Sequence, residues 1–469
     1  MITLTLSDIT RAVGGTLMVG EHTKCAGPEM LIEAVTTDTR AIEQGALFIA
    51  LVGERFDAHD FVVHAKDSGA VAVIVERKLD VDVTQIVVDD SLKALGHLGE
   101  YVHQQAKSKN RQSKTAKTIG ITGSCGKTTV KEMVASILNQ QGQVLYTAGN
   151  FNNDIGVPLT LLRSTENDDF SVIEMGANHV GEIAYTTQLT HPDIAIVNNV
   201  AEAHLEGFGS LQGVKQAKGE IYQGLEPSGT ALVNLDSQGG ELWNDVLSDK
   251  KVVTFAQQNP DADYFASDIV MSSQGSSSFT LHTPIGQVAI ELGLIGLHNV
   301  SNAIASAALA VQCDSSLLQI QLGLKTLNKV KGRVEVEKLT ETITLIDDSY
   351  NASVPAMKAA VDLLSQFNGE RWLILGNMAE LGHESLALHK EVGQHAAPFA
   401  FDHVLTYGED AKVISDLCSG MHFQSHDVML DYIEQHLLLL NQTSHTLLVK
   451  GANSAGMFKI ATALKENFS

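Results

Sequence analysis

Short apolar runs alternate with amphipathic segments along most of the chain, and this alternation predicts an α/β fold with mainly parallel sheets. One such run, TIGIT at residues 118–122, leads into a loop that contains two glycines. Beyond the loop, apolar side chains recur at helical spacing and share one face, at Val130, Met133, Val134, Ile137 and Leu138. The pattern therefore predicts a strand, a glycine loop and a helix in direct succession.

Two changes in this pattern predict domain boundaries. A polar, basic stretch without glycine, residues 104–117, interrupts the alternation. Near residue 330 a hairpin-like pattern begins and leads into a second series of strands and helices, each strand ending in a loop rich in Gly, Asn or Asp. Because 469 residues exceed what one hydrophobic core usually serves, we expect three domains, at 1–112, 113–330 and 331–469.

Composition narrows the class of protein. With 44% hydrophobic and 19% charged residues the chain is typical of a soluble globular protein, and its formal charge of −23 argues against a general nucleic-acid binder. The cysteines, Cys25, Cys125, Cys313 and Cys418, match no zinc-binding spacing. No apolar run has membrane-spanning length, and the start of the chain lacks a signal-peptide pattern. We therefore expect a cytoplasmic protein without membrane insertion.

The glycine loop, GSCGKTT, has the features of a phosphate cradle. Gly123 and Gly126 allow backbone N–H groups to turn towards phosphates, and the following helix N-terminus adds positive potential. Lys127 would reach the terminal phosphates, and Thr128 would offer its hydroxyl to Mg²⁺. Gly123 lies only three residues before Gly126, so the loop departs from the strict P-loop pattern. The alternative is a glycine turn that only packs.

Candidate magnesium ligands follow two later strands. Glu174 ends the apolar run FSVIE, and His204 lies in the loop after IAIV. Parallel strands bring their carboxyl ends to one edge of a sheet, so both groups are expected near the phosphate loop, where a hard cation needs oxygen ligands. Taken alone, a histidine such as His204 is more often an ordinary loop residue than a metal ligand. Lys218 lies in the helix predicted after this loop, and an isolated lysine there is more often solvated than functional.

Several segments together resemble the Mur ligase family, and they occur in the family's order along the whole chain. They are residues 36–65, TGSCGKTT, GNFNNDIGVPLTLL, GLHNVSNAIASAALA, KGRVE, DDSYNAS, GNMAELGHESLALHKEVG and LVKGANSAGM. The last two resemble the branch that adds D-alanyl-D-alanine. Taken singly, the asparagines could be helix caps and DDSYNAS an Asx turn.

The resemblance implies a three-domain Mur ligase architecture. An N-terminal domain would bind the uridine nucleotide, a central P-loop ATPase domain would bind ATP and Mg²⁺, and a C-terminal Rossmann-like domain would bind the acceptor. The implied reaction adds D-alanyl-D-alanine to UDP-N-acetylmuramoyl-tripeptide through an acyl phosphate, in peptidoglycan precursor synthesis. We expect these two substrates as the partners of a monomer that binds no nucleic acid.

The resemblance also assigns residues by motif. The expected ATP contacts are Gly123, Ser124, Cys125, Gly126, Lys127, Thr128, Thr129, Asn302, Arg333 and Asp348. The expected donor-substrate contacts are Thr39, Arg40, Asn152 and Asn153. The expected magnesium ligands are Thr128, Glu174, His204 and Lys218, with Lys218 carbamylated. The expected catalytic groups are Lys127, Lys218, His204 and Arg333.

Two departures from the family pattern stand out. Asp154 occupies a position where the branch more often has Glu, and Ala452 and Asn453 replace a Ser-Arg pair. Three alternative functions remain at this point: a sister ligase adding a single amino acid or extending folate, a regulatory P-loop switch, and a nucleotide-binding module without catalysis. The N-terminal uridine-type segment argues against folate, and GNMAELGHES argues against a single-amino-acid acceptor.

Overall fold

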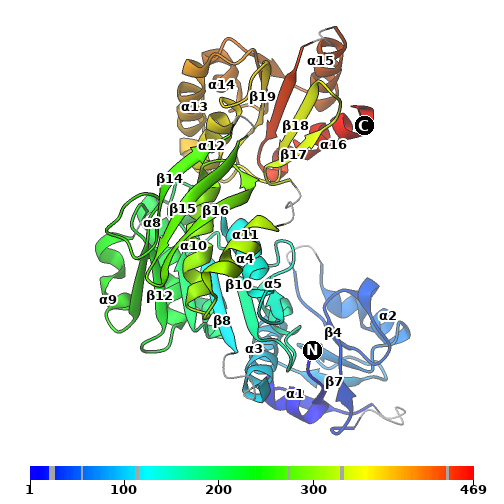
Figure 1. Ribbon diagram of the computed structural model, residues 1–469. Helices are drawn as coiled ribbons and strands as arrows, with labels where there is room; N and C mark the ends of the chain where they lie inside the picture. The colour runs from blue at the N-terminus through cyan, green and yellow to red at the C-terminus, as the bar shows by residue number, and fades with distance from the viewer. Residues whose placement is uncertain are drawn as a thin grey trace.

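A computed structural model describes residues 1–20, 27–53, 56–110, 116–237, 239–272, 275–327, 332–439 and 443–468. The molecule is elongated and consists of three α/β parts, each with its own sheet. The N-terminal part lies at one end and the C-terminal part at the other (Figure 1). Both predicted boundaries, 112/113 and 330/331, and Cys25 lie outside the described residues. No helix in the described ranges is both long enough and apolar enough to cross a membrane.

The N-terminal sheet has the order β2-β7-β6-β5-β4, antiparallel only between β2 and β7. In chain order its strands span Thr16–Met18, Val35–Thr36, Leu47–Ile49, Ala72–Val75 and Thr84–Val87. Two short strands, β1 (Leu4–Thr5) and β3 (Leu31–Ile32), pair beside helix α1 (Leu6–Ala12), and α2 (Val62–Asp67) covers the other face. All residues of β6 are buried because apolar clusters lie on both faces of the sheet.

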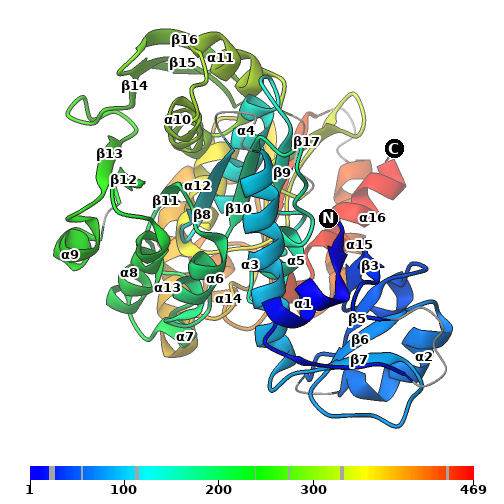
Figure 2. The ribbon, with the colours of Figure 1, turned by 90° about the horizontal axis from the view of Figure 1, so that it is seen from below.

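Helix α3 (Ser91–Lys109) joins the N-terminal sheet to the central part of the chain, as Figure 2 shows. The polar stretch 104–117, which was expected to separate two domains, is thus helical as far as Lys109. The buried His103 of α3 contacts Ser164 Oγ and Thr118 Oγ1 at 2.9 and 3.0 Å, and Lys107 forms an ion pair with Asp193 at 2.7 Å. These polar contacts anchor α3 to the central sheet.

The central sheet has the order β13-β12-β11-β8-β10-β9 and is parallel throughout. From β8 to β13 its strands span Lys117–Thr122, Val144–Tyr146, Phe170–Glu174, Ile194–Val197, Thr230–Asn234 and Lys251–Phe255. The helices around it include α4 to α9, at Lys127–Leu138, Gly156–Leu161, Glu182–Thr190, Leu205–Phe208, Leu211–Gly219 and Asn244–Leu247. The predicted strand, glycine loop and helix are β8, its loop and α4.

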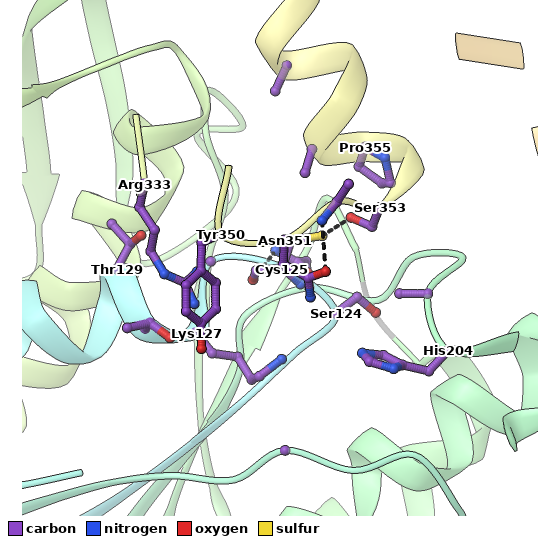
Figure 3. Close-up of a pocket in the computed structure, with 18 of the residues that line it drawn as sticks. Ser124, Cys125, Lys127, Thr129, His204, Arg333, Tyr350, Asn351, Ser353 and Pro355 are labelled. Atoms are coloured by element: carbon purple, nitrogen blue, oxygen red, sulfur yellow. Dashed lines mark hydrogen bonds between the residues drawn. The ribbon is translucent and has the colours of Figure 1, made fainter. Parts of the chain in front are cut away.

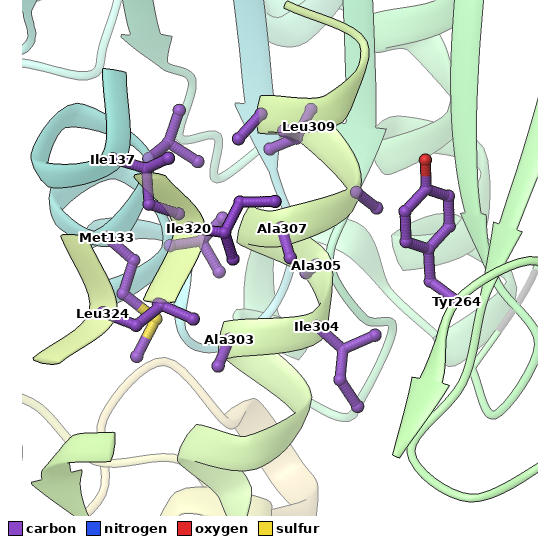
Figure 4. Packing of buried hydrophobic residues seen from close by; sticks show 14 of the residues in the cluster. Met133, Ile137, Tyr264, Ala303, Ile304, Ala305, Ala307, Leu309, Ile320 and Leu324 are labelled. Atoms are coloured by element: carbon purple, nitrogen blue, oxygen red, sulfur yellow. The ribbon is translucent and has the colours of Figure 1, made fainter. Parts of the chain in front are cut away.

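An antiparallel sheet that was not expected from the sequence follows β13. Its strands are β14 (Phe265–Met271), β15 (Ser276–Thr283) and β16 (Gly286–Ile295), and α10 (His298–Val311) and α11 (Leu317–Lys325) return to pack on α4. Buried alanines of α10 and side chains of α4 and α11 form the packing in Figure 4. A Cβ on Gly323 would lie 2.6 Å from the Ile137 Cα, so only glycine permits this approach of α11 to α4.

The C-terminal sheet has the order β17-β18-β22-β19-β20-β21, antiparallel only between β17 and β18. Its strands span, in chain order, Glu335–Lys338, Ile343–Asp348, Glu370–Gly376, His403–Tyr407, Met421–Phe423 and His445–Lys450. One face packs on α12 (Val354–Leu364), α13 (Ser385–Ala396) and α14 (Lys412–Leu417), and the other on α15 (His426–Leu439) and α16 (Phe458–Phe468). The expected hairpin start and Rossmann-like alternation are confirmed.

Candidate active site

A cavity of about 780 Å³ lies between the central and C-terminal sheets. The central sheet contributes the phosphate loop and the loops after β10 and β11, and the C-terminal sheet contributes the loops after β18, β19 and β22. Of the expected site residues, Ser124, Cys125, Gly126, Lys127, Thr128, Thr129, Asn152, Asn153, Glu174, His204, Asn302, Arg333 and Asp348 line it. Figure 3 shows part of this lining.

The phosphate loop has a conformation that requires glycine. Gly126 has φ +77°, and a Cβ at this position would lie 2.5 Å from Asn302 Oδ1 and 2.8 Å from Asn198 Nδ2. An L-amino acid side chain would be strained by the backbone angle and would collide with both amides. The Asn302 side chain, which accepts a hydrogen bond from Asn198 Nδ2 at 3.1 Å, therefore packs against the loop.

Two asparagines at the end of β11 hold the loop, and neither is among the site residues expected from the sequence. The Cys125 N–H donates to Asn199 Oδ1 at 2.8 Å, and the Cys125 carbonyl accepts from Asn198 and Asn199, both at 3.0 Å. The Ser124 hydroxyl donates to the Ala201 carbonyl at 3.0 Å. The available signal was the pair NN directly after a buried strand, where polar side chains reach the ligand edge of the sheet.

Lys127, Thr128 and Glu174 meet at the floor of the cavity. The Lys127 ammonium donates to the Gly123 carbonyl at 2.8 Å, and burial lowers its pKa while the nearby Glu174 opposes that shift. The Thr128 hydroxyl contacts both Glu174 oxygens at 2.9 and 3.1 Å, and Asn152 Nδ2 donates to Glu174 Oε1 at 2.8 Å. Glu174 is 1% exposed, so these neutral donors hold a buried carboxylate.

This arrangement fits a divalent cation beside a nucleotide. A buried carboxylate whose hydrogen-bond donors are neutral gains strongly from a bound cation, and a neighbouring threonine hydroxyl supplies a second oxygen. Within the described ranges, however, no three His, Cys, Asp or Glu groups converge as a preformed metal site. His204 lines the cavity but its Nδ1 contacts Glu380 Oε2 of the C-terminal domain.

Lys218 is buried beside the phosphate loop rather than solvated on its helix. It is 1% exposed, and its Nζ lies 5.2 Å from the centre of the Phe208 ring. Burial, together with the positive charge of Lys127, lowers the pKa of Lys218 to about 7. Lys218 does not line the cavity, but its amine is near enough to the phosphate loop to interact electrostatically with it.

The C-terminal domain places its own charged groups on the opposite wall. The Arg333 guanidinium lies 4.2 Å from the centre of the Tyr350 ring (Figure 3). Asp348 accepts from Lys450 Nζ at 2.6 Å and from the Val334 N–H at 3.2 Å. The cavity therefore has cations on both walls.

Two expected donor contacts lie elsewhere. Thr39 and Arg40 belong to the 3₁₀ helix Thr39–Ala41 of the N-terminal domain and do not line the cavity. The Arg40 side chain is 87% exposed and pairs with Asp38 at 2.7 Å, which lowers the pKa of that carboxyl to about 2. By contrast, Asn153 lies at the cavity and accepts from the Gly156 N–H at 2.9 Å, at the start of α5.

Comparison with known proteins places this geometry in a family. Residues 31–125 match the catalytic domain of the Mur ligase family, 121–310 the Mur ligase middle domain, and 332–453 the Mur ligase glutamate ligase domain. Over all of this chain and 99% of the relative, it is 46% identical to UDP-N-acetylmuramoyl-tripeptide--D-alanyl-D-alanine ligase of Escherichia coli (strain K12).

Solved structures agree with the sequence matches. A crystal structure of MurF from Acinetobacter baumannii superposes with a TM-score of 0.91 at 35% identity, covering 99% of both chains. MurF ligase from Thermotoga maritima in complex with ADP superposes with a TM-score of 0.80 at 25% identity, covering 93% of this chain and 98% of that one. This chain therefore belongs to the Mur ligase family.

Proposed function

We propose that the chain is an ATP-dependent ligase that joins D-alanyl-D-alanine to UDP-N-acetylmuramoyl-tripeptide in peptidoglycan precursor synthesis. The observation that carries this proposal is the single cavity in which the phosphate loop and Glu174 face the third-domain segments 376–393 and 448–457. Both sets of groups must surround the carboxylate of the donor substrate. The first set serves phosphoryl transfer to that carboxylate, and the second serves the amide formation that follows. Full-length similarity to a UDP-N-acetylmuramoyl-tripeptide--D-alanyl-D-alanine ligase supports the choice of substrates.

The reaction needs activation because a carboxylate and an amine do not condense unaided in water. A tripeptide carboxylate oxygen attacks the γ-phosphorus of ATP, the bond to ADP breaks, and an acyl phosphate forms. The dipeptide ammonium loses one proton, its nitrogen attacks the acyl carbon, phosphate leaves, and the nitrogen loses a second proton. Enclosing the acyl phosphate between the two domains would exclude water and protect it from hydrolysis.

The residues of the cavity divide this work. Lys127 and Arg333 offset negative charge on the phosphoryl oxygens, which is the main task in phosphoryl transfer. Asn302 and Asp348 contact the nucleoside of ATP. Thr128, Glu174 and His204 would hold Mg²⁺, which would add positive charge beside the phosphoryl oxygens. A carbamate on Lys218 adds a negative group behind the phosphate loop and so favours this cation.

The donor substrate extends away from the phosphate loop. Asn152 and Asn153 contact its muramoyl-peptide end, and Thr39 and Arg40 contact its uridine diphosphate end. Arg40 is exposed and its guanidinium is paired with Asp38, so diphosphate oxygens would replace that carboxylate in the same paired geometry. We further propose that the enzyme acts as a monomer in the cytoplasm.

One assay separates the ligase from its alternatives: phosphate release is measured with ATP, the UDP-linked tripeptide and the dipeptide, and each is omitted in turn. Stoichiometric release and product formation require all three compounds. Release with ATP alone identifies a regulatory switch, and the absence of release with all three identifies a binding module. Preference for a single amino acid over the dipeptide identifies a sister ligase.

A further inference from the structure

We propose that Glu380 binds the ammonium group of the acceptor dipeptide and holds it against the phosphate loop. This inference rests on the proposed function and adds a residue to it. D-alanyl-D-alanine reaches the site as an ammonium, which a carboxylate facing the cavity can bind, and the nitrogen attacks after this ammonium has lost one proton. The cavity-lining carboxylates within the described ranges are Glu174, Glu182, Asp348 and Glu380.

Three of these four carboxylates already have other tasks. Glu174 lies on the central domain and is held by Thr128 and Asn152. Glu182 accepts from the Asn178 N–H and from the His179 ring, both at 2.9 Å. Asp348 is paired with Lys450 at 2.6 Å. Glu174 and Glu182 belong to the central domain, and Asp348 is neutralised by Lys450, so Glu380 is the carboxylate of the described third-domain lining without a lysine partner.

Glu380 differs from them in its free capacity. Its side chain is 47% exposed, and the bond from the His204 ring goes to Oε2. The Oε1 atom has no hydrogen-bond partner in the described part of the chain. An ionised carboxylate offers about four acceptor positions, so an ammonium can join His204 on this group without displacing it.

The backbone also holds Glu380 in place at the border between the domains. Glu380 follows β19 and has φ +60°, a left-handed conformation that is strained for a residue with a side chain. Its carbonyl accepts from the Glu206 N–H of the central domain at 3.0 Å. Such strain persists where the surrounding structure requires one position, and here that position directs a carboxylate into the cavity.

The cations of the cavity support recognition through the ammonium. Lys450 is 3% exposed and committed to Asp348 and to the Asn351 carbonyl at 2.9 Å. The residues that follow it include the neutral Ala452 and Asn453, which also line the cavity. The third-domain wall, as far as it is described, thus offers the dipeptide carboxylate no uncommitted lysine. Arg333, the other cation of this wall, is assigned to the phosphoryl oxygens, so the ammonium is the end of the acceptor for which we assign a charged partner here.

The test compares Glu380→Gln, Glu380→Asp and, as a matched control, Glu384→Gln in the full-length enzyme. Glu384 is an exposed carboxylate four residues further on and does not line the cavity. Steady-state kinetics give KM for each of the three substrates. Separately, the acyl phosphate is trapped by borohydride reduction without dipeptide, which measures the first step alone.

Glu380→Gln should lower kcat/KM for the dipeptide about 10-fold to 100-fold, the usual range for losing a hydrogen-bonded charge. The KM values for ATP and the UDP-linked tripeptide and the yield of trapped acyl phosphate should stay unchanged. Glu380→Asp should recover part of the loss, and Glu384→Gln should match the wild type.

Two results overturn the assignment. An unchanged kcat/KM for the dipeptide in Glu380→Gln excludes ammonium binding. An equal loss of acyl-phosphate trapping shows that Glu380 acts through His204 or through the fold instead. Failure of the proposed function looks different, because the wild-type enzyme itself then forms no dipeptide-dependent product.

Discussion

The Nζ atom of Lys218 lies 5.2 Å from the centre of the Phe208 ring, in a buried position behind the phosphate loop. Burial and the charge of Lys127 bring its pKa to about 7. Carbamylation joins a neutral amine to CO₂ with loss of one proton, so the lowered pKa makes Lys218 reactive near neutral pH. A lysine on an exposed helix face would remain protonated.

We predict that Lys218→Ala is nearly inactive and that small carboxylic acids partly restore its activity, because they replace the carbamate charge. Activity of the wild type without added CO₂ should fall as pH falls below about 7, since protonation removes the nucleophilic amine. Lys215→Ala, on the same helix, is the control. Most of the activity remaining in Lys218→Ala would refute the role of this lysine.

Lys127→Ala should abolish ligation without unfolding the enzyme. Lys127 is the cation that the phosphate loop places on the cavity floor, and losing one such group costs on the order of 10² or more in rate. Turnover at saturating ATP and the thermal melting profile check both parts. Near-normal turnover with an unchanged melt would be inconsistent with the proposed site.

The dipeptide should be preferred over single amino acids as the acceptor. This prediction rests on segments 376–393 and 448–457, which line the third-domain wall and resemble the dipeptide-adding branch. The measurement is kcat/KM for D-alanyl-D-alanine against D-alanine, L-lysine and diaminopimelate. A single amino acid with the highest kcat/KM would assign the chain to a sister ligase.

D-alanyl-D-alaninamide should serve as an acceptor with kcat/KM within about tenfold of the dipeptide, the effect of weakening one hydrogen bond to a charge. The reason is that Ala452 and Asn453 are neutral and Lys450 is committed to Asp348. Competition between amide and free acid at equal concentration measures the ratio. A loss of several hundredfold would show that a cation binds the dipeptide carboxylate.

Acid should weaken the attachment of α3 to the central sheet and so lower the free energy of unfolding. Burial, with the nearby Lys107, lowers the pKa of His103 to about 3, whereas in an unfolded chain it is about 6.5. Between these values the unfolded chain binds a proton that the folded chain does not, so the free energy of unfolding falls as pH falls. The loss from His103 alone is about 2 kcal/mol at pH 5.

Denaturant unfolding between pH 8 and pH 4 measures this slope. His103→Gln should be less stable at neutral pH because it loses contacts to Ser164 and Thr118, but its stability should depend less on pH. His97→Gln, at an exposed position of the same helix, should keep the wild-type slope. An identical slope in His103→Gln would show that other groups cause the acid sensitivity.

Local patterns predicted the elements that carry the phosphate site. Apolar periodicity predicted β8, α4 and the Rossmann-like alternation, and strand ends correctly located Glu174 and His204 at the ligand edge. Such patterns show which faces of a strand or helix are buried. This information was enough to predict parallel sheets covered by helices and joined by short loops.

Other features depend on contacts between distant segments. Lys218 has the sequence surroundings of a solvated helix lysine, but α8 packs against α7 and other helices, and Lys218 is buried with its Nζ near the Phe208 ring. The antiparallel strands β15 and β16 alternate buried and exposed positions as half-buried strands do, so a signal for them was present in the sequence and was overlooked. The polar residues 104–109 have the composition of a linker. In the structure they continue α3, and their polar side chains are used for contacts with the central sheet, such as that of Lys107 with Asp193.

The anchoring of α3 has a consequence for the donor substrate. Since His103 and Lys107 attach this helix directly to the central sheet, the N-terminal sheet and the phosphate loop stand at a fixed separation. A molecule held by Arg40 at one end and by Asn152 at the other must span that separation. If the donor binds as proposed, the length of this helix sets the length of donor that fits, so the enzyme should select donors by length as well as by chemistry.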